Sequence, residues 1–313
     1  MNVSFFAEFP REDLEKLSLV DFPVKVYLAA SSLDEYRELE KRAKEINQLV
    51  ETAYWPILDK SYWVSPFSCN RELDRLHLDL SRNDETLEIL LDLELPKFWI
   101  RYVVYHLPRV LANAFKYHLR ITKPRIRKLF KMRDSYNISI TTTSYPVMSK
   151  YYLVNYLTFK LLGFLGVHFN PRAFNHRVIF MCYSSIRGDL LRKTLKNIRA
   201  RRPGVRENYH VGLGLLDYGM LSRTGFIRKL QRVGLLKGFH LLTPEKLDRD
   251  LALVEEHGVR DVTIYDLGGL SDGFVEVIGK YVSRDEVLHV RMPGIDCCLN
   301  RVFSGFSWAC YMA

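Results

Sequence analysis

Two kinds of segment alternate along nearly the whole chain. Short runs rich in Val, Ile, Leu, Phe and Tyr are typical of strands that are covered on both faces. Longer segments between them repeat apolar residues at helical spacing, as in Leu33–Asn47. The predicted strands are Val3–Phe9, Val24–Ala30, Val50–Ile57, Leu87–Leu95, Asn137–Ser144, Arg177–Tyr183, Tyr209–Leu216 and Val262–Leu267. The predicted helices are Arg11–Leu17, Leu33–Asn47, Arg71–Leu80, Phe98–Lys131, Tyr151–Leu165, Asp189–Arg201, Thr224–Val233, Pro244–His257 and Gly273–Tyr281.

This alternation indicates an α/β fold, and eight strands alternating with helices favour a (β/α)8 TIM barrel over an open sheet. No Gly-x-Gly-x-x-Gly turn follows the first strand, which argues against a dinucleotide-binding fold. We expect the barrel over residues 1–282, with an extended basic connection after the fourth strand. We expect residues 283–313 to form an irregular C-terminal tail that packs on the barrel or extends from it.

An apolar run in the fourth predicted strand ends in two acids, in the order Leu90-Leu91-Asp92-Leu93-Glu94-Leu95-Pro96. Side chains two residues apart in a strand point to the same face, so Asp92 and Glu94 share one. Like charges resist joint ionisation, which raises one of the two pKa values and makes a proton donor. The alternative is a strand end at the solvent boundary, with both acids hydrated or salt-bridged.

Active sites of such barrels lie at the C-terminal ends of the strands. Acids and aromatic residues dominate those positions here. Aromatic rings stack on sugar faces, and carboxylates perform the acid–base chemistry of glycoside cleavage. The strand ends carry Glu8, Tyr27, Trp55, Asp92, Glu94, Thr143, Tyr145, Tyr183, Ser184, Asp217, Tyr218 and Asp266.

Three of these strand ends resemble the family 18 glycoside hydrolases, which are chitinases and endo-N-acetylglucosaminidases. The fourth strand of that family ends in Asp-x-Glu, an aromatic residue and Pro, and Asp92-Leu93-Glu94-Leu95-Pro96 is similar. Its sixth strand ends in Met-x-Tyr-Asp, where this chain has Met181-Cys182-Tyr183-Ser184. Its seventh strand has the spacing of Leu213-Gly214-Leu215-Leu216-Asp217-Tyr218-Gly219.

The resemblance implies a role for each matched residue. Glu94 would be the proton donor, Asp92 would orient the N-acetyl group of the substrate, and Tyr183 would hold the oxazolinium intermediate formed by substrate assistance. The remaining strand-end residues would contact the sugar, namely Glu8, Trp55, Tyr145, Met181, Ser184, Asp217, Tyr218 and Asp266. The chain also departs from the family pattern. Two earlier acids correspond to Leu90 and Leu87, Ser184 replaces an acid, and Tyr265-Asp266 stands where the family usually has Trp.

Charge is distributed unevenly along this basic chain, which has a net charge of +10. Residues 97–133 contain 11 basic and no acidic residues, and residues 187–237 contain 13 basic and 3 acidic residues. In Phe98–Lys131 the basic residues alternate with aromatic and aliphatic ones. Such a segment can lie in an anionic membrane interface or cover an anionic or lipid-linked glycan. The alternative is an ordinary barrel helix with a solvated basic face. Nucleic acid ranks below anionic lipid, because no nucleic-acid-binding module is recognisable.

The five cysteines lack paired spacing, which favours a reducing compartment and no zinc site. The N-terminus opens on a strand, so we expect no signal peptide and a cytoplasmic location, with peripheral membrane contact left open. The low glutamine content is typical of thermophilic proteins.

Three function classes remain. The first is a glycoside hydrolase-like enzyme without a cofactor. The second is an isomerase or phosphodiesterase that binds Mg²⁺ or Mn²⁺ through the strand-end carboxylates. The third is a barrel that binds a glycan or membrane without catalysis.

Overall fold

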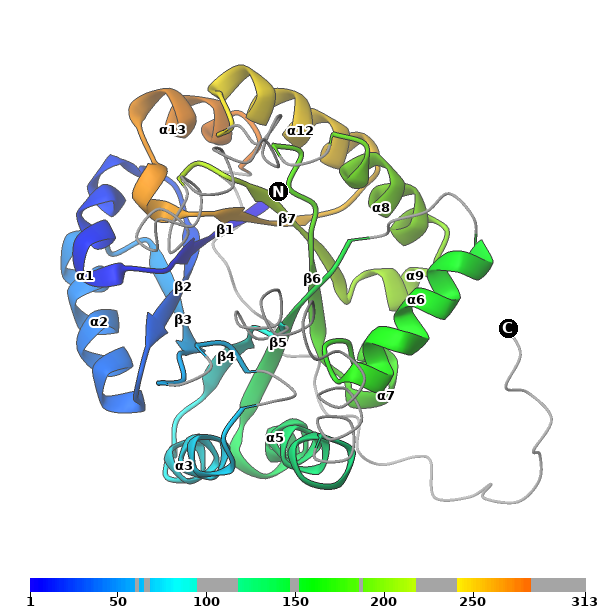
Figure 1. Cartoon of the computed structure of the whole chain (residues 1–313). Coiled ribbons are helices and arrows are strands. Elements are labelled where there is room, and N and C mark those ends of the chain that lie inside the picture. Colours follow the sequence, from blue (N-terminus) through cyan, green and yellow to red (C-terminus); the bar gives the residue numbers. More distant parts are fainter. Residues whose placement is uncertain are drawn as a thin grey trace, which may run out of the picture. The chain divides into compact units, whose positions relative to one another are not determined.

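Eight parallel strands close into a barrel in the computed structural model (Figure 1). The strands are β1 Asn2–Ala7, β2 Val24–Ala30, β3 Val50–Pro56, β4 Leu87–Leu91, β5 Ile138–Ser144, β6 Arg177–Met181, β7 Tyr209–Gly214 and β8 Asp261–Tyr265. Each strand pairs with its neighbours in the chain, and β8 pairs with β1. The structure describes residues 1–59, 62–64, 68–94, 118–146, 152–185, 188–217 and 241–282. The predicted (β/α)8 barrel is therefore confirmed.

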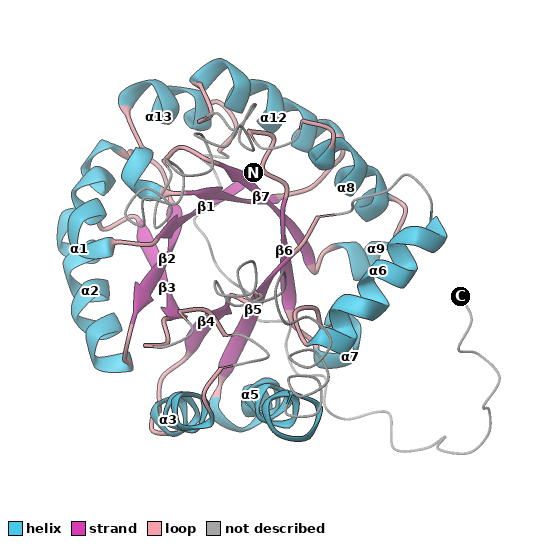
Figure 2. Cartoon of the chain, in the orientation of Figure 1, coloured by secondary structure: helices cyan, strands magenta, loops and turns pink. Residues whose placement is uncertain are grey.

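Helices form the outer layer around the ring of strands (Figure 2). They are α1 Pro10–Asp13, η1 Leu14–Leu19, α2 Leu33–Ile46, α3 Asn70–Ser81, η2 His118–Thr122, α5 Lys123–Tyr136, α6 Tyr152–Leu165, α7 Pro171–Phe174, α8 Leu190–Arg199, α9 Pro203–Arg206, α12 Pro244–Glu256, η3 Leu267–Gly269 and α13 Asp272–Gly279. Local sequence fixes several ends. The Ser32 side chain accepts a hydrogen bond from the backbone N–H of Glu35 at the start of α2. Asn137 ends α5 in the left-handed region, with φ 51°.

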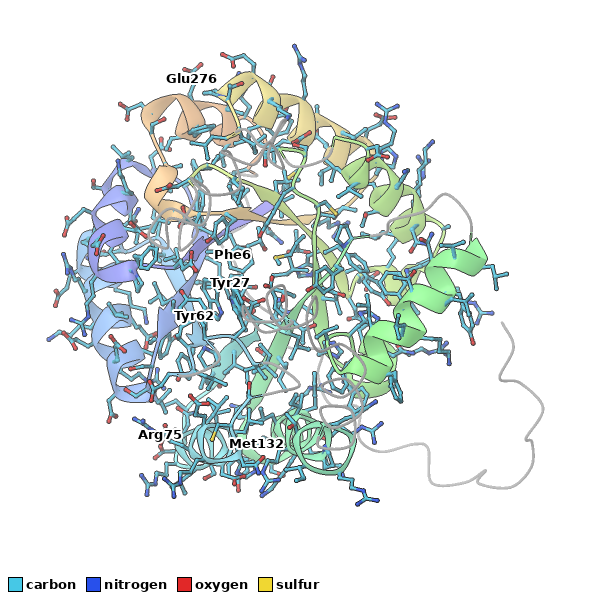
Figure 3. All side chains as sticks on the ribbon, in the orientation of Figure 1. Phe6, Tyr27, Tyr62, Arg75, Met132 and Glu276 are labelled. Atoms are coloured by element: carbon cyan, nitrogen blue, oxygen red, sulfur yellow. The ribbon has the colours of Figure 1, made fainter. Side chains whose placement is uncertain are left out.

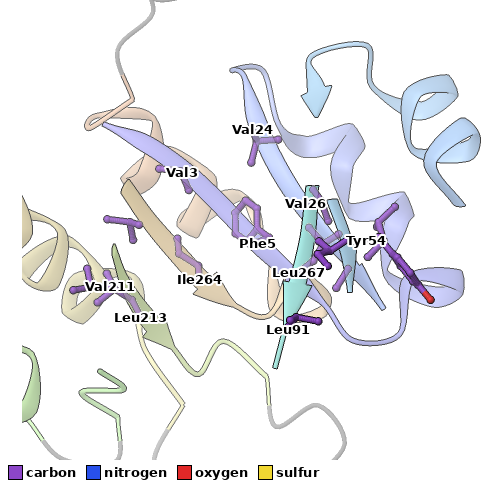
Figure 4. Packing of buried hydrophobic residues seen from close by; sticks show 14 of the residues in the cluster. Val3, Phe5, Val24, Val26, Tyr54, Leu91, Val211, Leu213, Ile264 and Leu267 are labelled. Atoms are coloured by element: carbon purple, nitrogen blue, oxygen red, sulfur yellow. The ribbon is translucent and has the colours of Figure 1, made fainter. Parts of the chain in front are cut away.

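Alternate residues of β1, β2, β3, β4 and β6 divide between two cores. The larger core lies between strands and helices, and Figure 4 shows part of it, including Phe5 of β1, Val26 of β2 and Ile264 of β8. The smaller core contains the residues of opposite parity and fills the barrel interior. It consists of Phe6, Tyr27, Ala29, Ala53, Trp55, Leu90 and Ile179.

A buried ion network occupies the N-terminal end of the barrel interior, centred on Glu88 of β4. Lys25 of β2 and Arg177 of β6 both reach Glu88 Oε2, at 2.8 and 2.9 Å. The hydroxyls of Tyr27 and Thr141 donate to Oε1. The pKa of Glu88 falls to about 2, because attraction to the two cations and the donated hydrogen bonds outweigh the opposing effect of burial. This network stabilises the N-terminal end of the barrel. The site was expected at the opposite end, where the strands have their C-termini.

Several predicted boundaries shift. The fourth strand was expected to reach Leu95, but β4 ends at Leu91. The predicted helix Phe98–Lys131 ends instead at Tyr136, and its described part begins with the π-helical turn His118–Thr122. Its first twenty residues, the predicted helix Thr224–Val233 and the tail 283–313 lie outside the described residues. Within the described chain, no helix is both long and apolar enough to span a bilayer.

Candidate active site

Asp92 and Glu94 follow β4 directly and point into the barrel. Leu93 between them is buried among the residues facing the helices, and it forms an isolated bridge with Val64. Because successive side chains of an extended segment alternate, Asp92 and Glu94 face the opposite way, toward the interior. The predicted shared face of the two acids therefore persists beyond the end of the strand. Asp92 is buried and Glu94 is half-buried.

Thr143 of β5 fixes the carboxyl of Asp92. Its hydroxyl donates to Asp92 Oδ1 and accepts a hydrogen bond from the backbone N–H of Leu93 at 3.2 Å. The pKa of Asp92 is raised to about 7, mainly by burial, with a further contribution from the nearby carboxylate of Glu8. The bond from Thr143 opposes that rise. Sequence reasoning placed Thr143 at a strand end but gave it no role.

Two tyrosines hold Glu8, the buried residue after β1. The Tyr62 hydroxyl donates to Glu8 Oε1 at 2.8 Å, and the Tyr265 hydroxyl of β8 donates to Oε2. In Figure 3, Tyr62 lies inside the ring with Phe6 and Tyr27, whereas labelled Glu276 lies on an outer helix. Glu8 is thus a third oriented carboxylate beside the predicted pair. Sequence reasoning did not identify Tyr62, because its link to Glu8 spans 54 residues.

Glu94 is electrostatically suited to keep a proton. Burial raises the pKa of Glu94 well above its ordinary value, and the nearby Asp92 and Glu8 raise it further. The pKa of Tyr183 is raised by the same acids. Burial has the largest effect, followed in decreasing size by the negative charges of Glu94, Asp92, Glu8 and Asp266. Tyr183 therefore lies within electrostatic range of these four carboxylates. A carboxyl whose pKa is raised in this way is a candidate proton donor.

Asp266 occupies the eighth strand end and is almost completely buried. A cis peptide bond joins it to Tyr265. Burial, followed by the neighbouring Asp13, Asp217 and Glu8, raises its pKa to about 8. Its Oδ1 atom has no hydrogen-bond partner among the described residues. Asp217 and Glu8, both predicted as site residues, are therefore electrostatic neighbours of Asp266.

Trp55 forms part of the floor below the acids. It is 2% exposed, and its ring meets that of Phe6 edge-on with 5.4 Å between centroids. Within the part of the chain that the structure describes, its indole N–H has no hydrogen-bond partner. Leu90, which stands where the family pattern has an acid, is fully buried in the same interior core.

Other predicted site residues are placed differently. The Ser184 hydroxyl donates to Asp250 of α12, and its carbonyl oxygen accepts from Lys246 at 3.1 Å, so Ser184 faces the helix layer. Met181 accepts a hydrogen bond on its sulfur from the Tyr183 hydroxyl at 3.0 Å. Tyr145 follows β5 and is half-buried. Tyr218 lies outside the described residues.

Carboxylate oxygens are ligands for Mg²⁺ and Mn²⁺, so acids at the strand ends are candidate metal ligands. Among the described side chains, no group of three or more His, Cys, Asp and Glu residues is arranged to hold a metal ion.

Two solved structures share the barrel architecture. The first is the C-terminal domain of a putative chitinase from Desulfitobacterium hafniense DCB-2, with a TM-score of 0.50 and 10% identity, covering 90% of this chain and 97% of that one. The second is a class V chitinase from Pseudomonas fluorescens Pf-5, with a TM-score of 0.50 and 12% identity, covering 90% and 99%. No family model matches this chain, and no curated protein matches it. The resemblance to chitinases is thus confirmed as a remote one, at the level of the fold.

Proposed function

We propose that this chain is a glycoside hydrolase-like enzyme that acts on an N-acetylated glycan, with Glu94 as general acid and Asp92 assisting. The observation that carries the proposal is the shared inward face of Asp92 and Glu94 after β4, with the pKa of Glu94 raised by burial and by the nearby Asp92 and Glu8. A general acid must hold a proton at the working pH and release it to the leaving group. The barrel shared with two chitinases supports this class of substrate.

The proposed reaction uses the acetamido group of the substrate as nucleophile. Glu94 donates its proton to the glycosidic oxygen as the bond to the anomeric carbon breaks, and the acetamido oxygen attacks that carbon to form an oxazolinium ion. Asp92 accepts a hydrogen bond from the acetamido N–H, and Thr143 keeps its carboxyl oriented for that contact. Water then opens the oxazolinium ion and returns a proton to Glu94. The Tyr183 hydroxyl, which contacts Met181 Sδ in this structure, supports the acetamido oxygen.

An anionic glycan, such as a lipid-linked sugar phosphate, is the form of substrate we favour within this class. The support is the positive net charge of the chain, which attracts anionic substrates over long distances. Turnover of an anionic glycan should therefore fall with added salt more steeply than turnover of its neutral counterpart. Equal salt dependence for the two substrates would remove this part of the proposal.

The decisive experiment compares two leaving groups. Glu94→Gln keeps the shape of the side chain but removes the transferable proton, so turnover of N-acetylglucosamine oligomers should fall by roughly 10²–10⁴-fold. A nitrophenyl glycoside has a leaving group that needs little protonation, so its turnover should fall much less. Asp92→Asn should slow both substrates, because it misorients the acetamido group. Glu45→Gln on the exposed face of α2 is the matched control and should change neither.

Other results would favour the other classes. Equal losses with both leaving groups would contradict the role of Glu94 as acid. Activity abolished by a chelator and restored by Mn²⁺ would favour a metal-dependent enzyme. Wild-type protein that binds these glycans and never cleaves them would favour a non-catalytic binding barrel.

A further inference from the structure

Helix α6 lies on the outside of the barrel (Figure 1). It carries a stripe of exposed apolar side chains. Among the described residues, eight large apolar side chains are exposed, and six of them belong to this helix. Leu153, Leu157 and Leu161 are 65%, 57% and 56% exposed. Their spacing of four residues places them on one face, and the other three members of the stripe are Val154, Tyr156 and Phe164. A contiguous apolar patch on a soluble surface marks an interaction site.

The opposite face of α6 accounts for its attachment to the barrel. Asn155 is buried, and the Phe159 ring lies 4.8 Å from the ring of His168 and 5.8 Å from that of Phe180. The exposed Leu153, Leu157 and Leu161 therefore lie on a different face of α6 from the one that packs on the barrel.

Positive charge borders the stripe. Lys160 lies within it, with its ammonium 5.3 Å from the centre of the Tyr156 ring. Lys123, at the start of α5, donates to the carbonyl oxygen of Gly163 at 2.9 Å and lies over the Phe164 ring. From Lys123, the exposed Arg127 and Lys131 continue along one face of α5 at intervals of four residues. The basic row of α5 therefore begins where the stripe of α6 ends.

These cations have few acidic neighbours. Residues 118–146 and 152–185 contain ten Lys and Arg residues and one acidic residue, Asp134. On α5, Arg125 pairs with Asp74, and Arg133 lies near Asp134. Within the described part of the chain, no ion pair involves Arg127, Lys128 or Lys131.

We propose that the apolar stripe of α6 and the basic face of α5 together form a docking surface for an anionic lipid bilayer. The apolar side chains would enter the boundary between headgroups and acyl chains, and the cations would contact lipid phosphates. Lysines and aromatic residues suit that boundary, because each has an apolar body and a polar or cationic end. This surface is separate from the acid cluster and does not depend on the proposed activity.

Charge decides among the occupants of this surface. A second copy of the chain would bring two basic faces together around the stripe, and like charges disfavour that contact. A protein partner would need a groove shaped to one projecting helix, whereas a bilayer adapts to it. A bilayer rich in anionic lipid complements both the apolar stripe and its basic border. The sequence placed membrane contact on Phe98–Lys131, whereas the structure adds the neighbouring α6 as its apolar component.

The test uses vesicles of phosphatidylcholine with about one third phosphatidylglycerol, and vesicles of phosphatidylcholine alone. The full chain should co-sediment with the anionic vesicles, and less so at high salt. Leu157→Ser combined with Leu161→Ser should weaken this binding at least about tenfold. Leu49 and Leu78 provide the matched control, because they are 47% and 48% exposed and lie elsewhere. Changing both of them to Ser should leave binding unaltered.

The basic border is tested separately. Replacing Arg127, Lys128 and Lys131 by Gln should weaken binding to the anionic vesicles. Helix α2 lies across the ring from α6 (Figure 1). The same loss of charge on α2 should have little effect, using Lys41, Arg42 and Lys44. Circular dichroism would confirm that each variant is folded.

Three results would overturn the proposal. The first is wild-type protein that does not bind the anionic vesicles. The second is a lack of specificity. Either the α6 variant and the Leu49 and Leu78 control lose vesicle binding equally, or wild-type protein binds neutral and anionic vesicles equally. The third is a wild-type dimer that binds no vesicles and that Leu157→Ser with Leu161→Ser converts to a monomer. That result would identify a second copy of the chain as the occupant.

Discussion

Replacing Glu88 by Gln should destabilise the barrel strongly at neutral pH and hardly at all near pH 2. Glu88 binds Lys25 and Arg177 in the barrel interior, and its side chain is only 11% exposed. Glutamine keeps the size of the side chain but removes the negative charge. The two cations would then lose the carboxylate that they share inside the barrel, which is costly in a buried position.

The magnitude follows from the pKa of Glu88, which lies at about 2 against an ordinary value of 4.5. Each pKa unit corresponds to about 1.4 kcal/mol, so the ionised carboxylate stabilises the fold by about 3 kcal/mol. Because the folded-state pKa is lowered, this stabilisation is fully present above pH 4.5. It is lost as the pH falls toward 2, where protonated Glu88 resembles Gln.

Urea unfolding followed by tryptophan fluorescence would measure the effect, since Trp55 lies inside the barrel. At pH 7 the free energy of unfolding of Glu88→Gln should be about 3 kcal/mol below wild type. The matched control is Glu51→Gln, which removes an acid 3.8 Å from the same Lys25 but 39% exposed. It should cost less than about 1 kcal/mol. A difference between Glu88→Gln and wild type that stays the same from pH 7 to pH 3 would refute the reasoning.

Two further predictions concern the acid cluster. Burial and neighbouring acids raise the pKa of Asp266 to about 8, so its ionisation destabilises the fold progressively as the pH rises from about 4 to 8. At pH 8 the free energy of unfolding of Asp266→Asn should therefore exceed that of wild type by up to about 6 kcal/mol, and its unfolding temperature should be higher. This difference in stability should disappear below about pH 4. A difference that does not vary with pH would contradict the prediction. Thr143→Val removes a hydrogen bond that lowers the pKa of Asp92, so that pKa should rise above about 7. A carboxyl titration by NMR that stays in place, or moves down, would show that Thr143 does not control Asp92.

The fold was predictable from sequence because its signals are local. The strand runs are continuous in apolar residues, and the spacing of apolar residues in Leu33–Asn47 identified α2 almost to its ends. The acid pair was also predictable. Alternation along an extended chain places Asp92 and Glu94 on one face, and the barrel places that face at the C-terminal ends of the strands.

The partners of those acids were not predictable. Thr143 meets Asp92 across 51 residues, and Tyr265 meets Glu8 across 257. Only the closed barrel brings such pairs together, and no local pattern encodes them. The direction of the Ser184 side chain was not predictable either. β6 ends at Met181, so strand alternation no longer determines where Ser184 points, and its hydroxyl donates to Asp250.

One signal in the sequence was overlooked. Glu88 and Arg177 each stand in an otherwise apolar run, and Lys25 interrupts the second strand in the same way. A charge within a buried strand needs a partner of opposite sign, so these residues could have been recognised as a network. Their pairing still required the order of strands around the barrel.

Leu90 separates two electrostatic environments on one face of a single strand. Glu88 and Asp92 lie four residues apart, about 13 Å along an extended chain, and their pKa values differ by about five units. The rise in the pKa of Asp92 comes from burial and Glu8, and neither cation below Leu90 contributes to it. An apolar layer that includes Leu90, Phe6 and Ile179 lies between the two positions, and the distance between them accounts for their separate titration. Replacing Leu90 by an acid would place a third carboxylate on this face between Glu88 and Asp92, and its negative charge would raise the pKa of Asp92 further.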